Sequence, residues 1–255
     1  MFWVKKLLAV LAVGISFSLA PGMSAVEAEP KAIEGYQQML TITSETVTEK
    51  TENGKIAVKM VYPILVVQGD YDTAVYNAVA SSIRAENVKM AELMKEWYDY
   101  ILPQAKEYAA RSGGYYSYTL TADLIRADEL MASYLLTHDI FTGGARPHMF
   151  FESKNFDAAT GAPIVLGSIC KDMDKLCDVL KKKLVAEGEK KGIKLEEGQI
   201  ENYLAANVYG DGRFDWTKTL GVITFYFSPG EITSPAAGSF IVELPMAEWS
   251  GLIKY

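Results

Sequence analysis

The sequence predicts an α+β protein, in which an antiparallel β-sheet made of a hairpin and a meander packs against one long amphipathic helix and two or three shorter helices. Three observations lead to this prediction. Asn53-Gly54 separates two alternating segments, which is a strong signal for a β-hairpin. Apolar residues then recur at helical spacing from Thr73 to Trp97. After Gly113-Gly114, segments rich in Tyr, Thr and Phe alternate with turn residues, as in a meander.

The N-terminal half, residues 29–112, should contain the hairpin and the long helix. Its strands are expected at 36–51 and 55–67, and Pro63 predicts an edge position or a bulge because proline has no N–H for the ladder. The helix can continue beyond Trp97, with a bend at Pro103, as far as Ala110. Its methionine and tryptophan positions have the spacing of a core face rather than a binding stripe.

The C-terminal half, residues 113–255, should pack as one unit with the first half. Its strands and helices follow from alternation, helical spacing and the turn residues between them. The expected strands are 115–126, 130–141, 149–156, 220–227 and 239–244, and the expected helices are 171–187, 196–207 and, as a short one, 245–253.

Residues 1–28 read as a secretory signal peptide. Two lysines precede an apolar run from Leu7 to Ala20, and cleavage fits after Ala28 or after Ala25. The run is shorter than the roughly 18 apolar residues of a membrane span. We therefore expect an exported protein, periplasmic or secreted, with no stable membrane span after cleavage. The alternative is an uncleaved membrane anchor.

The chain is acidic. Its formal net charge is −7, and removal of Lys5, Lys6 and Glu27 with the signal peptide changes this to −8. Such a charge argues against nucleic acid and against anionic lipid as partners, and it permits attraction to a cationic protein. The alternative is ordinary solubilising charge. Apolar residues make up 49% of the sequence, which is enough to bury a core.

Cys170 and Cys177 are the only cysteines, and both lie in the part expected to be exported. An oxidising compartment favours a disulfide between them. One continuous helix would separate the two residues by about 10.5 Å along its axis, which exceeds the reach of a disulfide. The predicted bridge therefore requires a helix break, and the alternative is two buried free thiols.

Two segments carry a specific pattern. In the first, Thr142-Gly143-Gly144 and Pro147 form a turn before a strand at 149–156, and a second turn follows at 157–161. The other segment is FYFSPGEI at 225–232, followed by AAG at 236–238 and IVELP at 241–245.

These segments resemble the RsiV-like family, which includes the extracellular part of lysozyme-sensing anti-sigma factors and the non-catalytic part of PdaC-type peptidoglycan deacetylases. The resemblance is clearest over about residues 115–253. It implies a fold with no reaction tied to its motifs, and it implies cell-envelope biology, since the anti-sigma relatives bind lysozyme directly. We expect a free-standing version of that domain, because no sigma-binding segment precedes the apolar run and no deacetylase domain follows.

Five residues are candidates for a ligand-binding or motif loop: Gly143, Gly144, His148, Tyr116 and Tyr118. The two glycines shape the turn, and His148 begins the next strand. Alternation places Tyr116 and Tyr118 on one face of their strand and Tyr115 on the other. Tyrosine is favoured at recognition surfaces and stacks on sugar rings. The alternative is cross-strand packing.

Standard catalytic motifs are absent from the sequence. An enzymatic alternative, a small glycan or peptidoglycan hydrolase, would need His138, Asp139 and His148 to converge on a metal or a water, with Glu152 nearby. Asp211 and Asp215 resemble only part of a calcium loop. We therefore predict a non-catalytic, exported recognition domain of the bacterial cell envelope that needs no cofactor. Its partner would be a cationic protein such as lysozyme, or peptidoglycan.

Overall fold

The computed structural model describes residues 40–68, 73–209 and 214–254, and it confirms the α+β class. The predicted signal peptide and Asp211 lie outside the described residues. The strands are β1 (Leu40–Lys50), β2 (Ile56–Val67), β3 (Tyr116–Ala127), β4 (Met131–Phe141), β5 (His148–Asp157), β6 (Asp215–Lys218), β7 (Val222–Phe227) and β8 (Phe240–Pro245). The helices are α2 (Asn77–Ser112), α3 (Leu166–Ile169), α4 (Met173–Lys190), α5 (Glu197–Tyr209) and α6 (Met246–Trp249), with a 3-10 turn at Pro235–Ala237.

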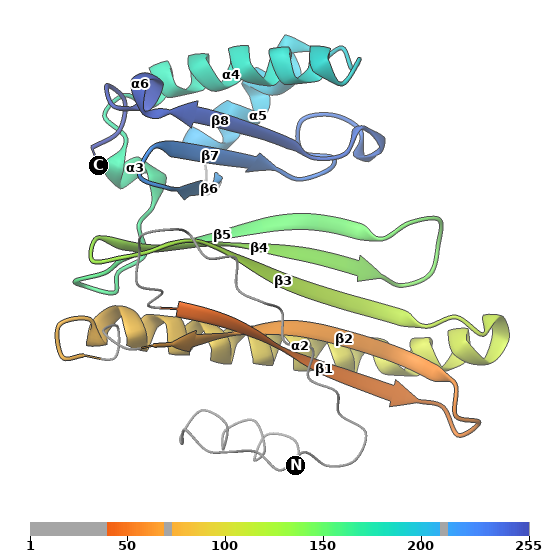
Figure 1. Cartoon of the computed structure of the whole chain (residues 1–255). Coiled ribbons are helices and arrows are strands. Elements are labelled where there is room, and N and C mark those ends of the chain that lie inside the picture. The colour runs from red at the N-terminus through yellow and green to blue at the C-terminus, as the bar shows by residue number, and fades with distance from the viewer. Residues whose placement is uncertain (1–39, 69–72, 210–213, 255) are drawn as a thin grey trace. The chain divides into compact units, whose positions relative to one another are not determined.

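These strands form two sheets rather than one. The first is a mixed sheet in the order β1-β2-β3-β4-β5, and the second is an antiparallel sheet in the order β6-β7-β8 (Figure 1). By its contacts the chain divides into two compact units, Met1–Thr121 with Asp139–Pro147, and Ala122–His138 with His148–Tyr255. Within the described ranges, no helix is both long and apolar enough to cross a membrane.

The first unit contains the predicted hairpin and long helix. β1 and β2 pair antiparallel from Leu40↔Val67 to Lys50↔Ile56, with a register shift at Glu49/Lys50. α2 runs along this hairpin (Figure 1) and buries Val79, Ile83, Met90 and Met94. The methionine positions are therefore core, as predicted. The helix continues through Pro103 to Ser112 and ends at Gly113, whose φ of 75° gives the left-handed cap that glycine favours.

The prediction of antiparallel pairing is wrong between β2 and β3. These strands pair parallel, from Val58↔Tyr116 to Val61↔Thr119. The reason is the connection: α2 carries the chain back along the hairpin before β3 starts, and a helical crossover of this kind joins parallel strands. Pro63 lies in β2 beyond this short ladder, and the register shift of the hairpin falls at Glu49/Lys50 instead of at Pro63.

The side chain of Asn87 on α2 binds β2 at Leu65, which lies beyond the parallel ladder. Its Nδ2 donates to the Leu65 carbonyl over 2.8 Å, and its Oδ1 accepts the Leu65 N–H over 3.0 Å. One amide therefore replaces the two hydrogen bonds that a neighbouring strand would make there. The same contact ties the middle of α2 to the sheet.

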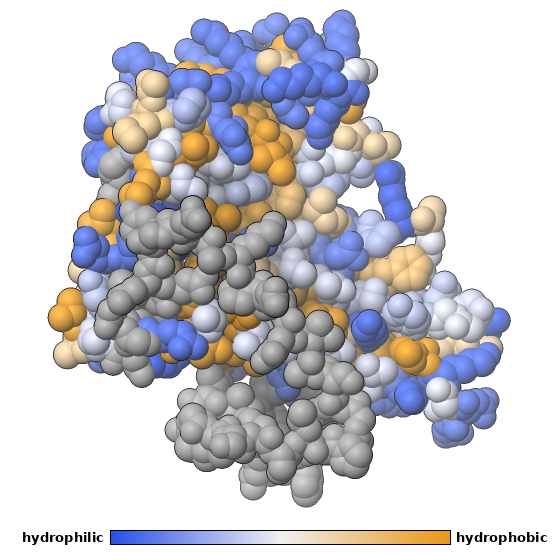
Figure 2. All heavy atoms as spheres, in the orientation of Figure 1, coloured by the Kyte–Doolittle hydropathy of each residue, from blue (hydrophilic) through white to orange (hydrophobic). Residues whose placement is uncertain are grey.

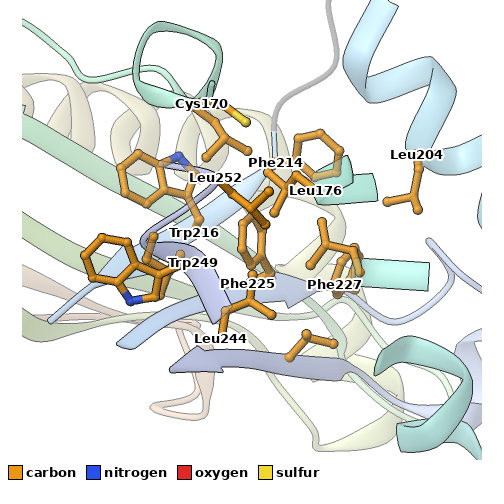
Figure 3. Packing of buried hydrophobic residues seen from close by; sticks show 14 of the residues in the cluster. Cys170, Leu176, Leu204, Phe214, Trp216, Phe225, Phe227, Leu244, Trp249 and Leu252 are labelled. Atoms are coloured by element: carbon orange, nitrogen blue, oxygen red, sulfur yellow. The ribbon is translucent and has the colours of Figure 1, made fainter. Parts of the chain in front are cut away.

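The second unit packs α4 and α5 against the three-stranded sheet. The sheet contributes Trp216, Phe225 and Leu244 to the core, and α4 contributes Leu176 (Figure 3). Leu180 of α4 belongs to the same core. In α4 the buried leucines recur at positions 176, 180 and 184, the spacing of one helical face. The opposite face is rich in lysine and glutamate, and Figure 2 shows hydrophilic side chains gathered over this helix.

Replacing Asn87 with alanine should lower the free energy of unfolding by about 1–3 kcal/mol, because the Leu65 N–H and C=O lose their partners where water has restricted access. Ser81→Ala is the control, since the exposed Ser81 hydroxyl donates to the Asn77 carbonyl of its own helix. Its effect should stay within about 0.5 kcal/mol. Chemical denaturation of the three proteins compares them, and equal effects of the two substitutions would contradict this role of Asn87.

Candidate functional site

The glycine turn between β4 and β5 has the conformation that its sequence suggests. Gly143 has φ of 82° and Gly144 has φ of 130°, and both angles lie in the region that side chains rarely adopt. A Cβ at Gly143 would lie 3.2 Å from the ring of Tyr108 and 3.4 Å from that of Tyr116, whereas a Cβ at Gly144 would meet nothing within 4 Å. Two separate features therefore require glycine at position 143: its positive φ angle and the close approach of the two tyrosine rings.

Tyr108 of α2 and Tyr116 of β3 form the aromatic pair beside this turn. Their ring centroids are 4.9 Å apart, at an interplanar angle of 35°. A Cβ at Gly114 would approach the Tyr108 ring to 2.9 Å, so the helix end also leaves room for this ring. Both tyrosines are partly buried. The two rings pack against the glycine turn within the first unit. The sequence pattern did not predict this role of Tyr108.

The candidate tyrosines of β3 differ in exposure. Tyr118 is 2% exposed and meets the Trp97 ring edge-on at 5.3 Å, so it belongs to the core. Tyr116 is partly buried, and both rings face α2, which fits the predicted alternation. Tyr115 is 41% exposed. Of these three side chains, Tyr115 has the largest exposed fraction and Tyr118 is almost completely buried.

The two histidines lie near Phe150 in the second unit. His138 is buried, its ring stacks on Phe150 at 4.1 Å, and its Nε2 lies 3.3 Å from Glu152 Oε2. The exposed His148 tilts toward the same phenylalanine at 5.7 Å. Hydrogen bonding to His138, together with Lys154 at 2.8 Å, lowers the pKa of Glu152 to about 2 although burial opposes the shift.

Asp139 follows His138 directly in β4, so its side chain leaves the strand on the opposite face. The arrangement that the hydrolase alternative needs, with both on one side, is not formed. Across the described ranges, no three His, Cys, Asp or Glu side chains are grouped so that they could hold a metal ion. Asp215, the second acid of the partial calcium loop, begins β6 and bonds to Ser153 instead.

The sequence did not reveal a polar network between β5 and β6. Asp215 Oδ1 accepts the Ser153 N–H over 2.7 Å and the Ser153 hydroxyl over 3.1 Å. The same hydroxyl oxygen accepts the Trp216 N–H over 2.9 Å. Ser153 and Asp215 thus satisfy backbone groups of each other's strand. A serine next to a carboxylate suggests a nucleophile, but this hydroxyl is already engaged on both sides.

Asn155 and Ser133 extend the network inward. Asn155 Nδ2 donates to the Trp216 carbonyl over 2.7 Å, and its Oδ1 accepts the Ser133 hydroxyl over 2.6 Å. Ser133 Oγ in turn accepts the Lys218 N–H over 3.3 Å. Both side chains are buried, and each uses its polar atoms on a partner. The spacing of Ser153 and Asn155, two apart among the aromatic residues of β5, is the one sequence signal for this network.

The network continues at its other end through Ser228. Its Oγ accepts the Phe151 N–H over 3.1 Å, and its own N–H donates to Glu231 Oε2 over 2.7 Å. Burial raises the pKa of Glu231, against the hydrogen bonds from Ser228 and Tyr203. Burial likewise raises the pKa of Asp215 from 3.8 to about 6, although both hydrogen bonds from Ser153 favour its charged form. Desolvation therefore outweighs hydrogen bonding at both carboxyl groups.

The predicted disulfide is not formed, and both thiols are free. The required helix break is present, since α3 ends at Ile169 and α4 begins at Met173. Cys170 instead packs in the core among leucines and aromatic rings (Figure 3), and burial raises its pKa. Cys177 lines a pocket of about 210 Å³ between α4 and α5. Burial and the neighbouring Asp174 raise its pKa to about 11, so it is a weak nucleophile at neutral pH.

No family model and no curated protein matches this chain. Two solved structures share its fold. One is a member of the DUF3298 family from Bacteroides fragilis NCTC 9343, 18% identical, with a TM-score of 0.57, covering 85% of this chain and 94% of its own. The other is a DUF3298 family protein from Pseudomonas aeruginosa PAO1, 11% identical, with a TM-score of 0.51, covering 84% of this chain and 95% of its own.

At these identities the likeness concerns the fold alone. DUF3298 is the RsiV/PdaC-like domain family, so the resemblance stated from the sequence is supported at the level of the fold. The chain therefore has a DUF3298-like α+β fold, and this likeness shows no specific ligand or activity for the chain itself.

Gly143→Ala should destabilise the first unit by about 2 kcal/mol or more, from the backbone angle and from the contact with Tyr108. In a Tyr108→Ala background the cost of the contact with the Tyr108 ring should disappear, and the cost of the backbone angle, about 1 kcal/mol, should remain. Gly144→Ala should cost the same in both backgrounds, because no side chain lies near it. Thermal unfolding of this double-mutant set measures these losses of stability. If Gly143→Ala costs the same stability in both backgrounds, the Tyr108 ring does not restrict position 143.

Asp215→Asn should change how stability depends on pH. Because the folded protein raises the pKa of Asp215 from 3.8 to about 6, its carboxyl group lowers stability as pH rises through that window. The neutral amide still accepts from Ser153, so Asp215→Asn should match the wild type near pH 4 and exceed it at pH 7 by roughly 2–3 kcal/mol.

Asp215→Ala is the matched control for the hydrogen bonds. It lacks the acceptor, so it should be about 1–3 kcal/mol less stable than Asp215→Asn at both pH values. Urea unfolding at pH 4 and pH 7 measures all three proteins. A difference between wild type and Asp215→Asn that does not change with pH would refute the shifted titration.

Proposed function

We propose that this chain is an exported, non-catalytic recognition domain of the bacterial cell envelope, and that its partner is a cationic protein such as lysozyme. The observation that carries the proposal is the DUF3298-like fold, because the RsiV-like family that the sequence resembles includes lysozyme-binding domains. The signal-like N-terminus supports export, and the formal net charge of −7 supports a cationic partner.

A surface on α2 has the chemistry that such a partner requires. Leu93 is 41% exposed and Tyr100 is 71% exposed, seven residues apart and so close to the same side of the helix. Glu92 and Glu96 are exposed beside them, and neither has an ion-pair partner among the described residues. Exposed apolar side chains flanked by unpaired carboxylates suit a partner that presents lysine and arginine around an apolar centre.

Binding through this surface should depend on salt differently from attraction by net charge alone. Net charge alone acts over about 10 Å at 0.1 M salt and weakens as salt rises. A contact that buries Tyr100 and Leu93 would persist, because apolar burial does not depend on screening. Salt dependence therefore separates the proposed recognition from a solubilising charge.

The test is calorimetric binding of the chain without residues 1–28 to a cationic lysozyme at about 0.02 M and 0.15 M salt. We expect binding at both, and we expect Glu92→Lys with Glu96→Lys to weaken it at least about tenfold, or about 1.4 kcal/mol. The control is Glu129→Lys with Glu189→Lys, which makes the same change of net charge at exposed acids elsewhere and should change affinity less.

Each other outcome argues against the proposal. Binding at low salt only would mean charge attraction alone. Equal weakening by both pairs of substitutions would remove α2 from the interface. Binding to peptidoglycan fragments but not to lysozyme would show that the partner is the cell wall and not a cationic protein.

A further inference from the structure

The second unit buries two cationic side chains, Arg126 and Lys218, and one carboxylate, Asp128, which pairs with Arg126. Arg126 is 7% exposed, Lys218 is 3% exposed and Asp128 is 7% exposed. Arg126 and Asp128 lie at the β3–β4 turn, and Lys218 ends β6. The group therefore carries one net positive charge in a place that water reaches only poorly.

Asp128 is committed to Arg126 and to its own turn. The Arg126 Nε donates to Asp128 Oδ2 over 2.6 Å, while Asp128 Oδ1 accepts the N–H groups of Leu130 and Met131 over 2.9 and 3.1 Å. These contacts shape the turn and fix the guanidinium. The four N–H groups of Arg126 other than Nε–H have no acceptor within the described part of the chain.

Lys218 lacks an ion-pair partner in the same described residues. Its Nζ donates to the Thr219 carbonyl over 3.1 Å and lies 4.4 Å from the centre of the Trp249 ring. A carbonyl and a ring face are weaker partners for an ammonium group than a carboxylate. Among the described residues, Thr219 supplies the one hydrogen-bond acceptor for the three N–H donors of this ammonium group. Burial and the nearby charge of Arg126 lower the pKa of Lys218, which Asp128 only partly offsets.

A buried cation without a counter-charge is costly, and natural proteins rarely retain one without a partner. The polar network holds this one in place, because the Lys218 N–H donates to Ser133 Oγ and its strand is tied to Asn155 through the Trp216 carbonyl. The backbone of Lys218 is thus held by the same hydrogen bonds that join β6 to β4 and β5. A lysine that only improves solubility would be exposed to water, so a buried lysine with a fixed backbone is more typical of a binding residue.

We propose that Arg126 and Lys218 bind the carboxylate of a small ligand that carries a short apolar group. One negative charge balances the group, and the planar guanidinium matches the two oxygens of a carboxylate. The two turns that frame the cations also present Leu130, 55% exposed, and Leu220, 49% exposed, to receive the apolar part. This inference does not rest on the proposed partner of α2.

Sodium butyrate is the probe, and butyramide, which has the same shape without the charge, is its control. We expect saturable binding of butyrate to the chain without residues 1–28, measured by calorimetry at constant ionic strength in sodium chloride. Butyramide should give no saturable heat. Lys218→Met, which keeps an unbranched side chain without the charge, should weaken butyrate binding at least tenfold. Lys182→Met, at an exposed lysine of α4 with no ion pair among the described residues, should leave it unchanged.

The wild type alone also tests the proposal, should Lys218→Met fail to fold. The indole N–H of Trp249 should shift saturably with butyrate in NMR spectra, because its ring lies under the Lys218 ammonium, and that of Trp97 in the other unit should not. Equal responses to butyrate, butyramide and chloride would overturn the site. Tighter binding of inorganic phosphate than of butyrate would overturn the assignment to a carboxylate.

Discussion

The second unit depends on one joint, in which the edges of two sheets are linked by side chains in place of a backbone ladder. β5 ends the five-stranded sheet and β6 ends the three-stranded sheet. An open strand edge exposes unpaired N–H and C=O groups, which can hydrogen-bond to a strand of another chain. Here Ser153, Asp215 and Asn155 occupy those groups across the gap. Because the network is largely buried, each polar atom must keep its partner, so the position of one strand dictates that of the other.

The same principle explains where the chemically interesting residues lie. Asn87 completes the open side of β2 in the first unit, as Ser153 and Asp215 do for β5 and β6 in the second. The joint holds Lys218 by its backbone, which keeps its ammonium against Trp249 in spite of the desolvation cost. Structural hydrogen bonds therefore account for the buried polar groups that face other strands. They leave the unbalanced charge at Arg126 and Lys218, and the exposed acids of α2, for binding.

Local signals predicted the parts of this fold that local physics decides. Asn53-Gly54 and the alternation around it gave the hairpin, and the helical spacing of apolar residues gave α2 and its buried methionines. The parallel pairing of β2 with β3 and the separation into two sheets follow from where distant strands meet, which periodicity does not encode. The candidate site shows the same limit. The positive φ angles at Gly143 and Gly144 were predictable from the Gly-Gly turn. The burial of Tyr118, the free thiols and the role of Asp215 depend on tertiary neighbours, which the sequence pattern does not show.

Native-state hydrogen exchange of three amides tests the joint most directly: those of Phe151, Ser153 and Trp216, each of which donates to a side chain. If the side chains hold the two edges together, these amides should exchange only when the whole unit unfolds, with the same free energy of opening as the amide of Phe225 in the central strand β7. Exchange at the rate of a frayed edge, while Phe225 stays protected, would show that the joint opens by itself and would contradict its central place in the structure.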